Sequence, residues 1–287
     1  MTGVEPSRTP PPDVDDVDLE IDLLLEAIAR KYSYDFRDYA RASMRRRIRS
    51  ALEAMGLPSV SLLQHAVLHD QRQFTALLTR LTVPVSDMFR DPAYFAALRR
   101  DVLPLLDTWP SIKIWVAGCS TGEEVYSLAI LIDEAGLLAR TRLYATDINP
   151  ESLRTAEAGV YALPRLVQFT QNYQRAGGTR SLADYYTAAY GGAAFDRRLR
   201  DRITFSDHSL ASDQVFAEVH FVSCRNVLIY FNRQLQDRAI GLFRESLVTH
   251  GFLGLGSHER LGPGDQARGF VERSRDERIY QRVSDAG

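Results

Sequence analysis

The sequence has little cysteine, no long apolar run and almost no net charge. Its two cysteines, Cys119 and Cys224, are too few for a disulfide framework, and each closes an apolar stretch, which favours reduced structural thiols. No run of about 18 apolar residues is present, and the N-terminus is Pro-rich and acidic, so we expect neither a membrane span nor a signal peptide. A net charge of −2 argues against a general nucleic-acid binder. The cytoplasm fits these absences best.

Paired cysteines or carboxylates at ligand spacing are also absent, so we predict no metal site. The remaining composition is that of an ordinary globular protein, with 45% hydrophobic and 25% charged residues over 287 positions. Residues 1–18 combine proline and aspartate with few apolar side chains, which predicts a disordered tail. Apolar periodicity then predicts a helical domain at 19–81, a linker at 82–91 and an α/β domain at 92–287.

The α/β domain is organised around one strand, loop and helix. Residues 112–116 form a short β-branched and aromatic run, typical of a buried parallel strand. The loop between Gly118 and Gly122 allows a tight turn with close backbone approach, and an amphipathic helix follows it. A second strand at 143–146 delivers Asp147 at its carboxyl end. Strand, glycine turn, helix, strand and acidic residue is typical of a nucleoside-cofactor site.

The details of this loop favour S-adenosylmethionine over a dinucleotide. A dinucleotide places its pyrophosphate at the helix N-terminus, where Glu123 and Glu124 would repel it. S-Adenosylmethionine carries an amino group and a sulfonium but no phosphate, so carboxylates suit it. Asp147 lies further along than the roughly 20 residues expected of a dinucleotide site, but it can still accept hydrogen bonds from ribose hydroxyls. The alternative is that both glutamates only complement the helix dipole.

The helical domain contains the most polarised segment of the chain. Residues 37–49 hold six arginines and a single acidic residue. Four of these arginines are spaced by four and align on one side of a predicted helix: Arg37, Arg41, Arg45 and Arg49. Because Glu53, four positions after Arg49, is the one acidic residue at that spacing from any of them, this row could dock an acidic partner, either protein or nucleic acid. The alternative is a solvated face with packed arginine stems.

The linker ends in Asp91-Pro92, which predicts a helix start with Asp91 as N-cap and Pro92 in the first turn. Arg90 stands just before that helix, where the dipole disfavours a cation. A cation in this place needs another reason, such as a carboxylate ligand.

The second half of the chain contains a break in the strand–helix rhythm. Residues 160–200 are rich in tyrosine and Gly-Gly turns, which predicts an inserted subdomain of short strands or hairpins. Its tyrosines could serve protein recognition or pack a thin core. The rhythm then resumes, and segments 252–256 and 278–283 predict a terminal hairpin. Alternation of this kind indicates an α/β sheet that binds ligands at the carboxyl ends of its strands.

Several separated motifs resemble those of the CheR family, S-adenosylmethionine-dependent glutamate methyltransferases that act on chemotaxis receptors. The resemblance covers roughly residues 20–283, and the order of the motifs makes it specific. The motifs are Met44-Arg-Arg-Arg-Ile48, Met88-Phe-Arg-Asp-Pro92, Ala117-Gly-Cys-Ser-Thr-Gly-Glu-Glu124, Ala145-Thr-Asp-Ile148 and Ser223-Cys-Arg-Asn-Val-Leu-Ile-Tyr-Phe231. The resemblance implies a Rossmann-like class I S-adenosylmethionine-dependent methyltransferase domain, with an N-terminal helical domain and an inserted small β-subdomain.

The resemblance also implies the residues of the site. Arg90 and Tyr230 match the residues that orient the substrate carboxylate, and the acidic cofactor contacts fall on Asp147 and on Glu124 or its neighbour Glu123. The other implied cofactor contacts are Ser86, Arg90, Ser209, Leu210, Arg225 and Asn226. Four positions depart from the family pattern: Ser86 replaces a threonine, Ser209 an asparagine, Val125 a common proline, and Pro84 an asparagine found in some members.

The family's partners are the cytoplasmic helices of methyl-accepting chemotaxis receptors, which are acidic at their methylation sites. The resemblance therefore makes the helical domain a receptor-docking domain, whose face holds Arg41, Arg45, Arg46 and Arg49. The products would be a glutamate methyl ester and S-adenosylhomocysteine. We expect a monomer that does not insert into the membrane and binds no nucleic acid.

The chemistry implied here needs no general base. A glutamate with a pKa of about 4.3 is already ionised at neutral pH, and no convincing His–carboxylate or Ser–His constellation lies near the motifs. A nucleic-acid methyltransferase is the nearest enzyme alternative, but the Asn/Asp-Pro-Pro-Tyr segment of amino-directed enzymes is absent at Cys224-Arg-Asn226. The other alternative is a non-catalytic S-adenosylmethionine-sensing or scaffold protein on the same fold.

Overall fold

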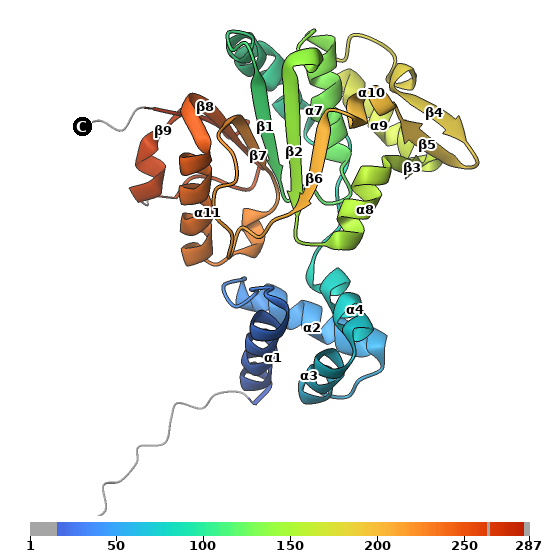
Figure 1. The fold of residues 1–287 in the computed structure, drawn as a ribbon, viewed down its shortest axis with the longest axis vertical. Coiled ribbons are helices and arrows are strands. Elements are labelled where there is room, and N and C mark those ends of the chain that lie inside the picture. The colour runs from blue at the N-terminus through green and yellow to red at the C-terminus, as the bar shows by residue number, and fades with distance from the viewer. Residues whose placement is uncertain (1–15, 263–264, 284–287) are drawn as a thin grey trace, which may run out of the picture. The chain divides into compact units, whose positions relative to one another are not determined.

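The structure is a computed structural model that describes residues 16–262 and 265–283 (Figure 1). The chain divides into two compact units. One holds Arg41–Leu81 and the chain before Asp38, and the other holds Asp38–Ala40 together with the chain from Thr82 onward. The first helix begins at Asp16, so the last three residues of the predicted tail are helical. The rest of that tail, residues 1–15, lies outside the described residues.

The helical unit consists of α1 (Asp16–Tyr32), α2 (Arg41–Met55), α3 (Val60–His69) and α4 (Gln71–Leu81). Each helix buries one apolar face, as the periodicity of the sequence predicts. The fully buried side chains of this core include Leu24, Ile28, Met44, Ile48, Leu63, Val67, Leu77 and Leu81. Tyr32 stacks on Phe74 with ring centroids 3.7 Å apart, which joins the ends of α1 and α4.

The prediction that four arginines align on one helix is wrong for Arg37, and carboxylates neutralise part of the remaining row. Arg37 precedes α2, and its guanidinium binds Asp35 at 2.7 Å and Glu26 at 2.8 Å. Arg41 forms ion pairs with Asp18 and Asp22 of α1, and Arg45 lies 3.4 Å from Asp18. The sequence argument considered only partners on the same helix, whereas these carboxylates come from α1.

Two arginines of α2 remain without a carboxylate partner. Arg46 and Arg49 are exposed, and neither forms an ion pair or side-chain hydrogen bond with any described residue. They are therefore the two cations of this helix whose charge is available to a partner.

The second unit is built on a seven-stranded mixed sheet of order β6-β2-β1-β7-β8-β10-β9. The central strand β1 (Ile112–Ala117) runs parallel to β2 (Thr141–Asp147) and β7 (Val219–Cys224). Parallel strands β6 (Ile203–Asp207) and β8 (Leu247–Leu255) flank them. Strand β10 (Ile279–Arg282) pairs antiparallel with β8, as predicted, but its hairpin partner is the unpredicted edge strand β9 (Phe270–Ser274).

Helices cover both faces of this sheet. Side chains alternate along β1, so Ile114 packs with α7 (Glu123–Glu134) and Trp115 packs with α11 (Arg233–Ser246) on the opposite face. The α7 face also receives a continuous helical segment made of α5 (Pro92–Ala97), a π-helical turn (Leu98–Val102) and α6 (Leu103–Leu106). Short 3₁₀ turns connect other elements: Leu138–Arg140, Leu163–Arg165, Leu182–Tyr185, Leu228–Tyr230 and Asp265–Gly269.

The strand order reverses at β1. The chain passes from β1 through α7 to β2 on one side, and then places β7 on the other side of β1. Ligands of open parallel sheets bind outside the carboxyl ends of the strands at such a switch point. The loops after β1, β2 and β7 are therefore the first place to look for a site.

The insertion between β2 and β6 contains a helix that the sequence prediction missed. After α8 (Pro150–Ala158) come β3 (Val160–Ala162), β4 (Tyr186–Ala189) and β5 (Gly192–Phe195), in the antiparallel order β3-β5-β4, followed by α10 (Arg197–Arg200). The missed helix is α9 (Leu166–Arg175), which lies between β3 and β4 in the sequence.

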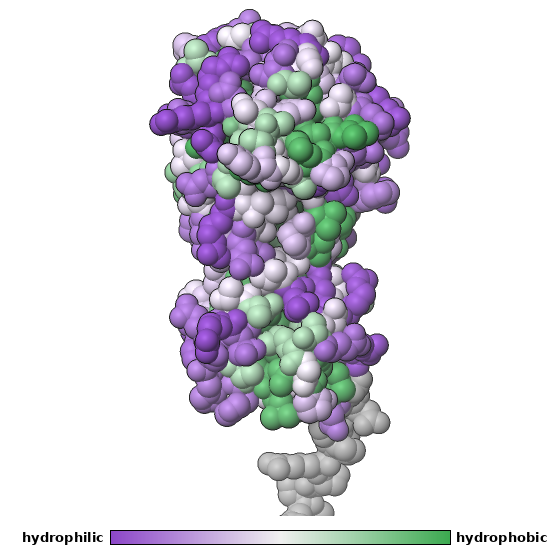
Figure 2. All heavy atoms as spheres, turned by 90° about the vertical axis from the view of Figure 1, so that its right-hand side faces the viewer, coloured by the Kyte–Doolittle hydropathy of each residue, from purple (hydrophilic) through white to green (hydrophobic). Residues whose placement is uncertain are grey.

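Most tyrosines of the insertion pack its core. Tyr161, Tyr173 and Tyr185 are buried, whereas Tyr190 is fully exposed at the β4–β5 turn. Figure 2 shows hydrophilic side chains over most of the face it presents, with patches of apolar side chains between them. The thin-core interpretation therefore holds for the three buried tyrosines.

We predict that Asn149, the N-cap of α8, stabilises the start of that helix. Its Oδ1 accepts hydrogen bonds from Glu151 N at 2.9 Å and Ser152 N at 3.3 Å. Asn149→Ala should lower the free energy of unfolding by about 1 kcal/mol in urea titrations. Asn149→Asp keeps the acceptor and should cost less; equal losses for both variants would contradict the capping role.

Candidate functional site

The loop after β1 folds back on the end of β2. Gly118 N and Cys119 N both donate to Thr146 O at 2.8 Å. Gly118 has φ +71°, and a Cβ there would lie 2.4 Å from Val227 Cγ2, so glycine is needed for both reasons. Cys119 and Cys224 are buried free thiols, as predicted. The glycine loop thus packs directly on the segment that follows β7.

Asp147 receives two backbone hydrogen bonds at the end of β2. Its Oδ2 accepts from Ser120 N at 2.8 Å, and its Oδ1 accepts from Asn149 N at 2.9 Å. Burial raises the pKa of this carboxyl, although the N–H groups of Asn149 and Ser120 act in the opposite direction. A carboxylate has about four lone-pair sites, so each oxygen can still accept another donor. Asp147 is therefore held in place without being saturated.

Arg225 joins three segments of the site through its guanidinium. Its Nη1 lies 3.1 Å from Glu124 Oε2 in the first turn of α7, and its Nη2 lies 2.7 Å from Asp91 Oδ2. The guanidinium also stacks on the Tyr94 ring, 4.1 Å from the centroid. Burial alone would lower the pKa of Arg225, but Glu124 and Asp91 are among the groups that raise it overall, so it stays charged.

The structure corrects the predicted capping role of Asp91, whose side chain belongs to this network. Asp91 does precede Pro92 at the start of α5, but its backbone is left-handed, with φ 56°, and its side chain makes no capping hydrogen bond. Its carboxylate binds Arg225 instead. The charged partner forms a stronger hydrogen bond than a neutral backbone N–H would.

Glu123 and Glu124 differ in their surroundings. Glu123 is completely buried; its Oε1 pairs with Arg165, and its Oε2 accepts from the Thr121 hydroxyl at 2.6 Å. Arg165 also donates to Ser86 O at 2.6 Å. This glutamate therefore connects the insertion to the linker. Glu124 retains 13% side-chain exposure, so it is the more accessible of the two predicted cofactor contacts.

Arg90 is positioned by a strained backbone. Its neighbours Phe89 and Asp91 both have left-handed φ, at 47° and 56°, which is costly for residues other than glycine. Phe89 N donates to Ser127 Oγ at 2.9 Å, which fixes the segment on α7. Arg90 itself is half-buried, and its guanidinium forms no hydrogen bond or ion pair with a described residue. It is thus a cation presented without an internal counter-ion.

Tyr230 closes a short turn after β7. Asn226 has a left-handed φ of 59°, and residues Leu228–Tyr230 form a 3₁₀ turn. The carboxylate of Glu259 accepts backbone hydrogen bonds from Asn226 at 2.9 Å and from Ile229 at 3.2 Å. The backbone of Tyr230 also accepts from Ala40 N at 2.8 Å. We name residues Asn226–Tyr230 the tyrosine turn.

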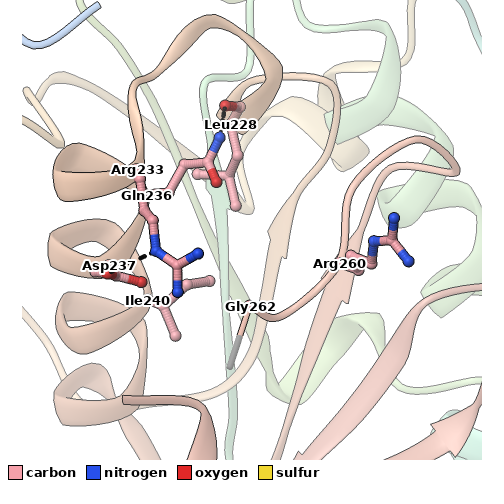
Figure 3. Close-up of a pocket in the computed structure, with 7 residues that line it drawn as sticks. All are labelled: Leu228, Arg233, Gln236, Asp237, Ile240, Arg260 and Gly262. Carbon is pink, nitrogen blue, oxygen red and sulfur yellow. Dashed lines mark hydrogen bonds and ion pairs between the residues drawn. The ribbon is translucent and has the colours of Figure 1, made fainter. Parts of the chain in front are cut away.

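The α11 side of the tyrosine turn is held by Gln236. Its Nε2 donates to Leu228 O at 3.0 Å and to Phe231 O at 3.1 Å. Figure 3 shows this amide pointing at Leu228, beside a hollow of about 290 Å³ between α11 and the segment that carries Arg260. The turn is therefore anchored from more than one direction.

The remaining predicted cofactor contacts lie along the carboxyl edge of the sheet or behind it. Ser209 follows β6 and its Oγ accepts from Ala211 N at 3.3 Å, while Leu210 is buried among side chains of the α11 face. Ser86 is half-buried in the linker. His208 is also buried, with its Nε2 3.1 Å from Gln214 O.

The arrangement fits S-adenosylmethionine. The site combines Asp147, which can accept from ribose hydroxyls, with the carboxylate of Glu124, which suits an ammonium group. Arg90 is a cation that no described residue pairs with, so it can meet a carboxylate. These donors and acceptors suit a cofactor with an amino group and ribose hydroxyls better than a phosphate, which the carboxylates at the start of α7 would repel.

Comparison with known proteins agrees with this class. Residues 84–275 match the family described as CheR methyltransferase, SAM binding domain, and residues 19–82 match the family described as CheR methyltransferase, all-alpha domain. A protein of Pseudomonas putida with the provisional name methyltransferase Cher3 is 57% identical over 92% of this chain and 97% of its own length. The chain therefore belongs to the CheR family of S-adenosylmethionine-dependent methyltransferases.

More distant relatives carry a functional name. The chemotaxis protein methyltransferase of Listeria monocytogenes is 30% identical over 86% of this chain and 94% of its own length. That of Salmonella typhimurium is 28% identical over 78% of this chain and 77% of its own length.

Sequence reasoning missed three residues of this site. Asp91 was interpreted as a cap, and neither Arg165 nor Glu259 was singled out. Glu259 did carry a signal, because it follows closely on the carboxyl end of β8, where parallel strands place functional groups. Arg165 carried no such signal, because its partners Glu123 and Ser86 lie about 40 and 80 positions away in the sequence.

We predict that Asp147 accepts hydrogen bonds from the cofactor. Asp147→Ala should weaken S-adenosylhomocysteine binding by about 1.5–3 kcal/mol in calorimetry. Asp207→Ala removes the exposed carboxylate paired in register on β6 and should have little effect. Because burial raises the pKa of Asp147, the ionised acceptor is lost at a higher pH than for an ordinary aspartate. Affinity should therefore fall as the pH drops through that pKa, and unchanged affinity in folded Asp147→Ala would exclude the contact.

Proposed function

We propose that this enzyme transfers the methyl group of S-adenosylmethionine to glutamate side chains of methyl-accepting chemotaxis receptors, in the cytoplasm. The observation that carries the proposal is Arg90: a half-buried cation, on a strained segment beside the Arg225 network, with no internal counter-ion among the described residues. A substrate carboxylate would supply the missing negative charge. The names of the Listeria and Salmonella relatives support chemotaxis as the setting.

The residues of the site need only to position the reactants. The bound cofactor supplies a methyl group on a sulfonium, and a glutamate is ionised at neutral pH. In the described part of the chain, no histidine forms an ion pair with a carboxylate that would activate it as a base. Arg90 would orient and desolvate the substrate carboxylate, and the Tyr230 hydroxyl would fix its remaining freedom. Pairing that is too strong would weaken the nucleophile, so the role of Arg90 is orientation more than neutralisation.

Docking of the receptor is assigned to α2. Receptor methylation helices are acidic, and Arg46 and Arg49 are exposed cations that pair with no carboxylate among the described residues of the helical unit. Arg41 and Arg45 belong to the same predicted face, but acidic residues of α1 already compensate them. We therefore place the electrostatic contribution to docking on Arg46 and Arg49.

The catalytic roles predict distinct kinetic effects. Tyr230→Phe should lower kcat about 10²-fold, because small misplacements of reacting groups carry such penalties, and should leave S-adenosylhomocysteine affinity unchanged. Arg90→Ala should lower kcat further and also weaken the cofactor. The rate should rise along one acidic limb near the pKa of glutamate and stay flat through neutrality. A second limb near pH 6.5 would indicate a histidine base and contradict the base-free mechanism.

The docking assignment predicts a change in KM alone. The double variant Arg46→Glu, Arg49→Glu should raise KM for receptor and reduce its salt dependence, while kcat and S-adenosylhomocysteine affinity stay constant. Arg41→Gln is the matched control on the same helix, since its charge is already paired, and should change KM little. Equal KM values for the double variant and the wild type would favour a merely solvated face.

A further inference from the structure

We propose that Glu259 is the positioning residue of the tyrosine turn: its buried carboxylate fixes the backbone that presents Asn226 and Tyr230 to the reaction. The proposal deepens the proposed function, because it rests on the roles of those two residues. Glu259 itself would touch neither cofactor nor substrate, since its carboxylate is directed at backbone N–H groups.

The carboxylate of Glu259 binds the tyrosine turn and the residue that follows β8. Its Oε2 accepts from Asn226 N at 2.9 Å and from Gly256 N at 2.7 Å, while its Oε1 accepts from Ile229 N at 3.2 Å. The residue is only 5% exposed. No arginine or lysine pairs with it among the described residues. A buried carboxylate without a counter-ion is costly, so these N–H groups are what stabilise its charge.

The tyrosine turn, which Glu259 holds, would not adopt its bent backbone unaided. Asn226 has a φ of 59°, which an asparagine reaches more easily than most residues but still at some cost. The bonds to Asn226 and Ile229 lie three residues apart and bracket the whole bend. Tyr230 directly follows Ile229, so the position of its side chain depends on the same carboxylate.

Other contacts complete the anchoring but do not replace Glu259. Gln236 binds the carbonyl oxygens of Leu228 and Phe231, on the side of the turn shown in Figure 3. Val227 packs against Gly118. These contacts reach carbonyl groups and a side chain, whereas Glu259 is the described side chain that binds the N–H groups of the turn. Its loss would leave Asn226 N and Ile229 N without the acceptor that each has in the structure.

The test measures receptor methylation and S-adenosylhomocysteine binding in the full chain. The variants are Glu259→Gln, Tyr230→Phe, and the two combined. Glu259→Gln should lower kcat about 10- to 100-fold, as a misplaced reacting group would. Because it acts through Tyr230, the combined loss should fall well short of the product of the two single losses. Independent, multiplicative losses would overturn the proposal.

Glu134→Gln provides the matched control. Glu134 is a buried carboxylate of α7 that accepts from Thr179 N and Thr179 Oγ1 at 3.0 Å, remote from the tyrosine turn. It should lower thermal stability while keeping kcat within about twofold of the wild type. An equal loss of kcat in this control would assign the Glu259 effect to general destabilisation and overturn the proposal.

Gly256→Ala tests the same contact without removing charge, should Glu259→Gln fail to fold. A Cβ at this position would lie 2.8 Å from both Asn226 N and Glu259 Oε2, so it should force them apart and lower kcat with the same non-additivity.

Failure of the proposed function is distinguishable: the wild type would then transfer no methyl groups to receptors. S-Adenosylhomocysteine affinity would then decide, because displacing Asn226 should weaken it several-fold, and an unchanged affinity would overturn the proposal.

Discussion

The site depends on one buried ion-pair network centred on Arg225. Its side chain is 1% exposed, yet it carries a charge held by Glu124 from α7 and Asp91 from the linker. A charge in that place is tolerable only when both carboxylates are present, because removing one partner of a buried pair is strongly destabilising. The network therefore fixes the end of β7, the start of α7 and the approach to α5 relative to one another.

Backbone strain is concentrated around the same site. Four of the eight non-glycine residues with left-handed φ in the described chain surround it: Phe89, Asp91, Ser120 and Asn226. Each has a partner that holds it, namely Ser127 for Phe89, Arg225 for Asp91, Asp147 for Ser120 and Glu259 for Asn226. Strain of this kind persists where the surroundings over-determine the backbone, and it is typical of preorganised functional sites.

The sequence was most informative where the signal is local. The strand, glycine loop, helix and Asp147 follow one another within a short stretch, and their pattern predicts both the fold of the stretch and its ligand. The family motifs assigned Arg225 to the site, and the structure pairs its guanidinium with Glu124 at the start of α7. Neither source could reveal that Asp91 turns away from its helix to reach Arg225, because that choice depends on a residue 134 positions further along.

The misses have the same origin. The arginines of α2 were expected to be uncompensated, yet Asp18 and Asp22 of another helix pair with Arg41. Helix α9 was missed because tyrosine and glycine dominate the composition of the insertion, although its own apolar residues follow a helical period. The position of Glu259 just after a strand indicated a functional place, but its partners in the tyrosine turn are about 30 residues away in the sequence and became visible only in the fold.

The central claim, methylation of glutamate carboxylates, is tested most directly by the chemical nature of the product. Membranes containing the cognate receptors should be incubated with the enzyme and methyl-labelled S-adenosylmethionine, and the labelled protein then treated with mild base. A glutamate methyl ester predicts that the label is transferred to the receptor and is released by base as volatile methanol. Label that stays bound through base treatment would place the methyl group on nitrogen or sulfur and contradict the account.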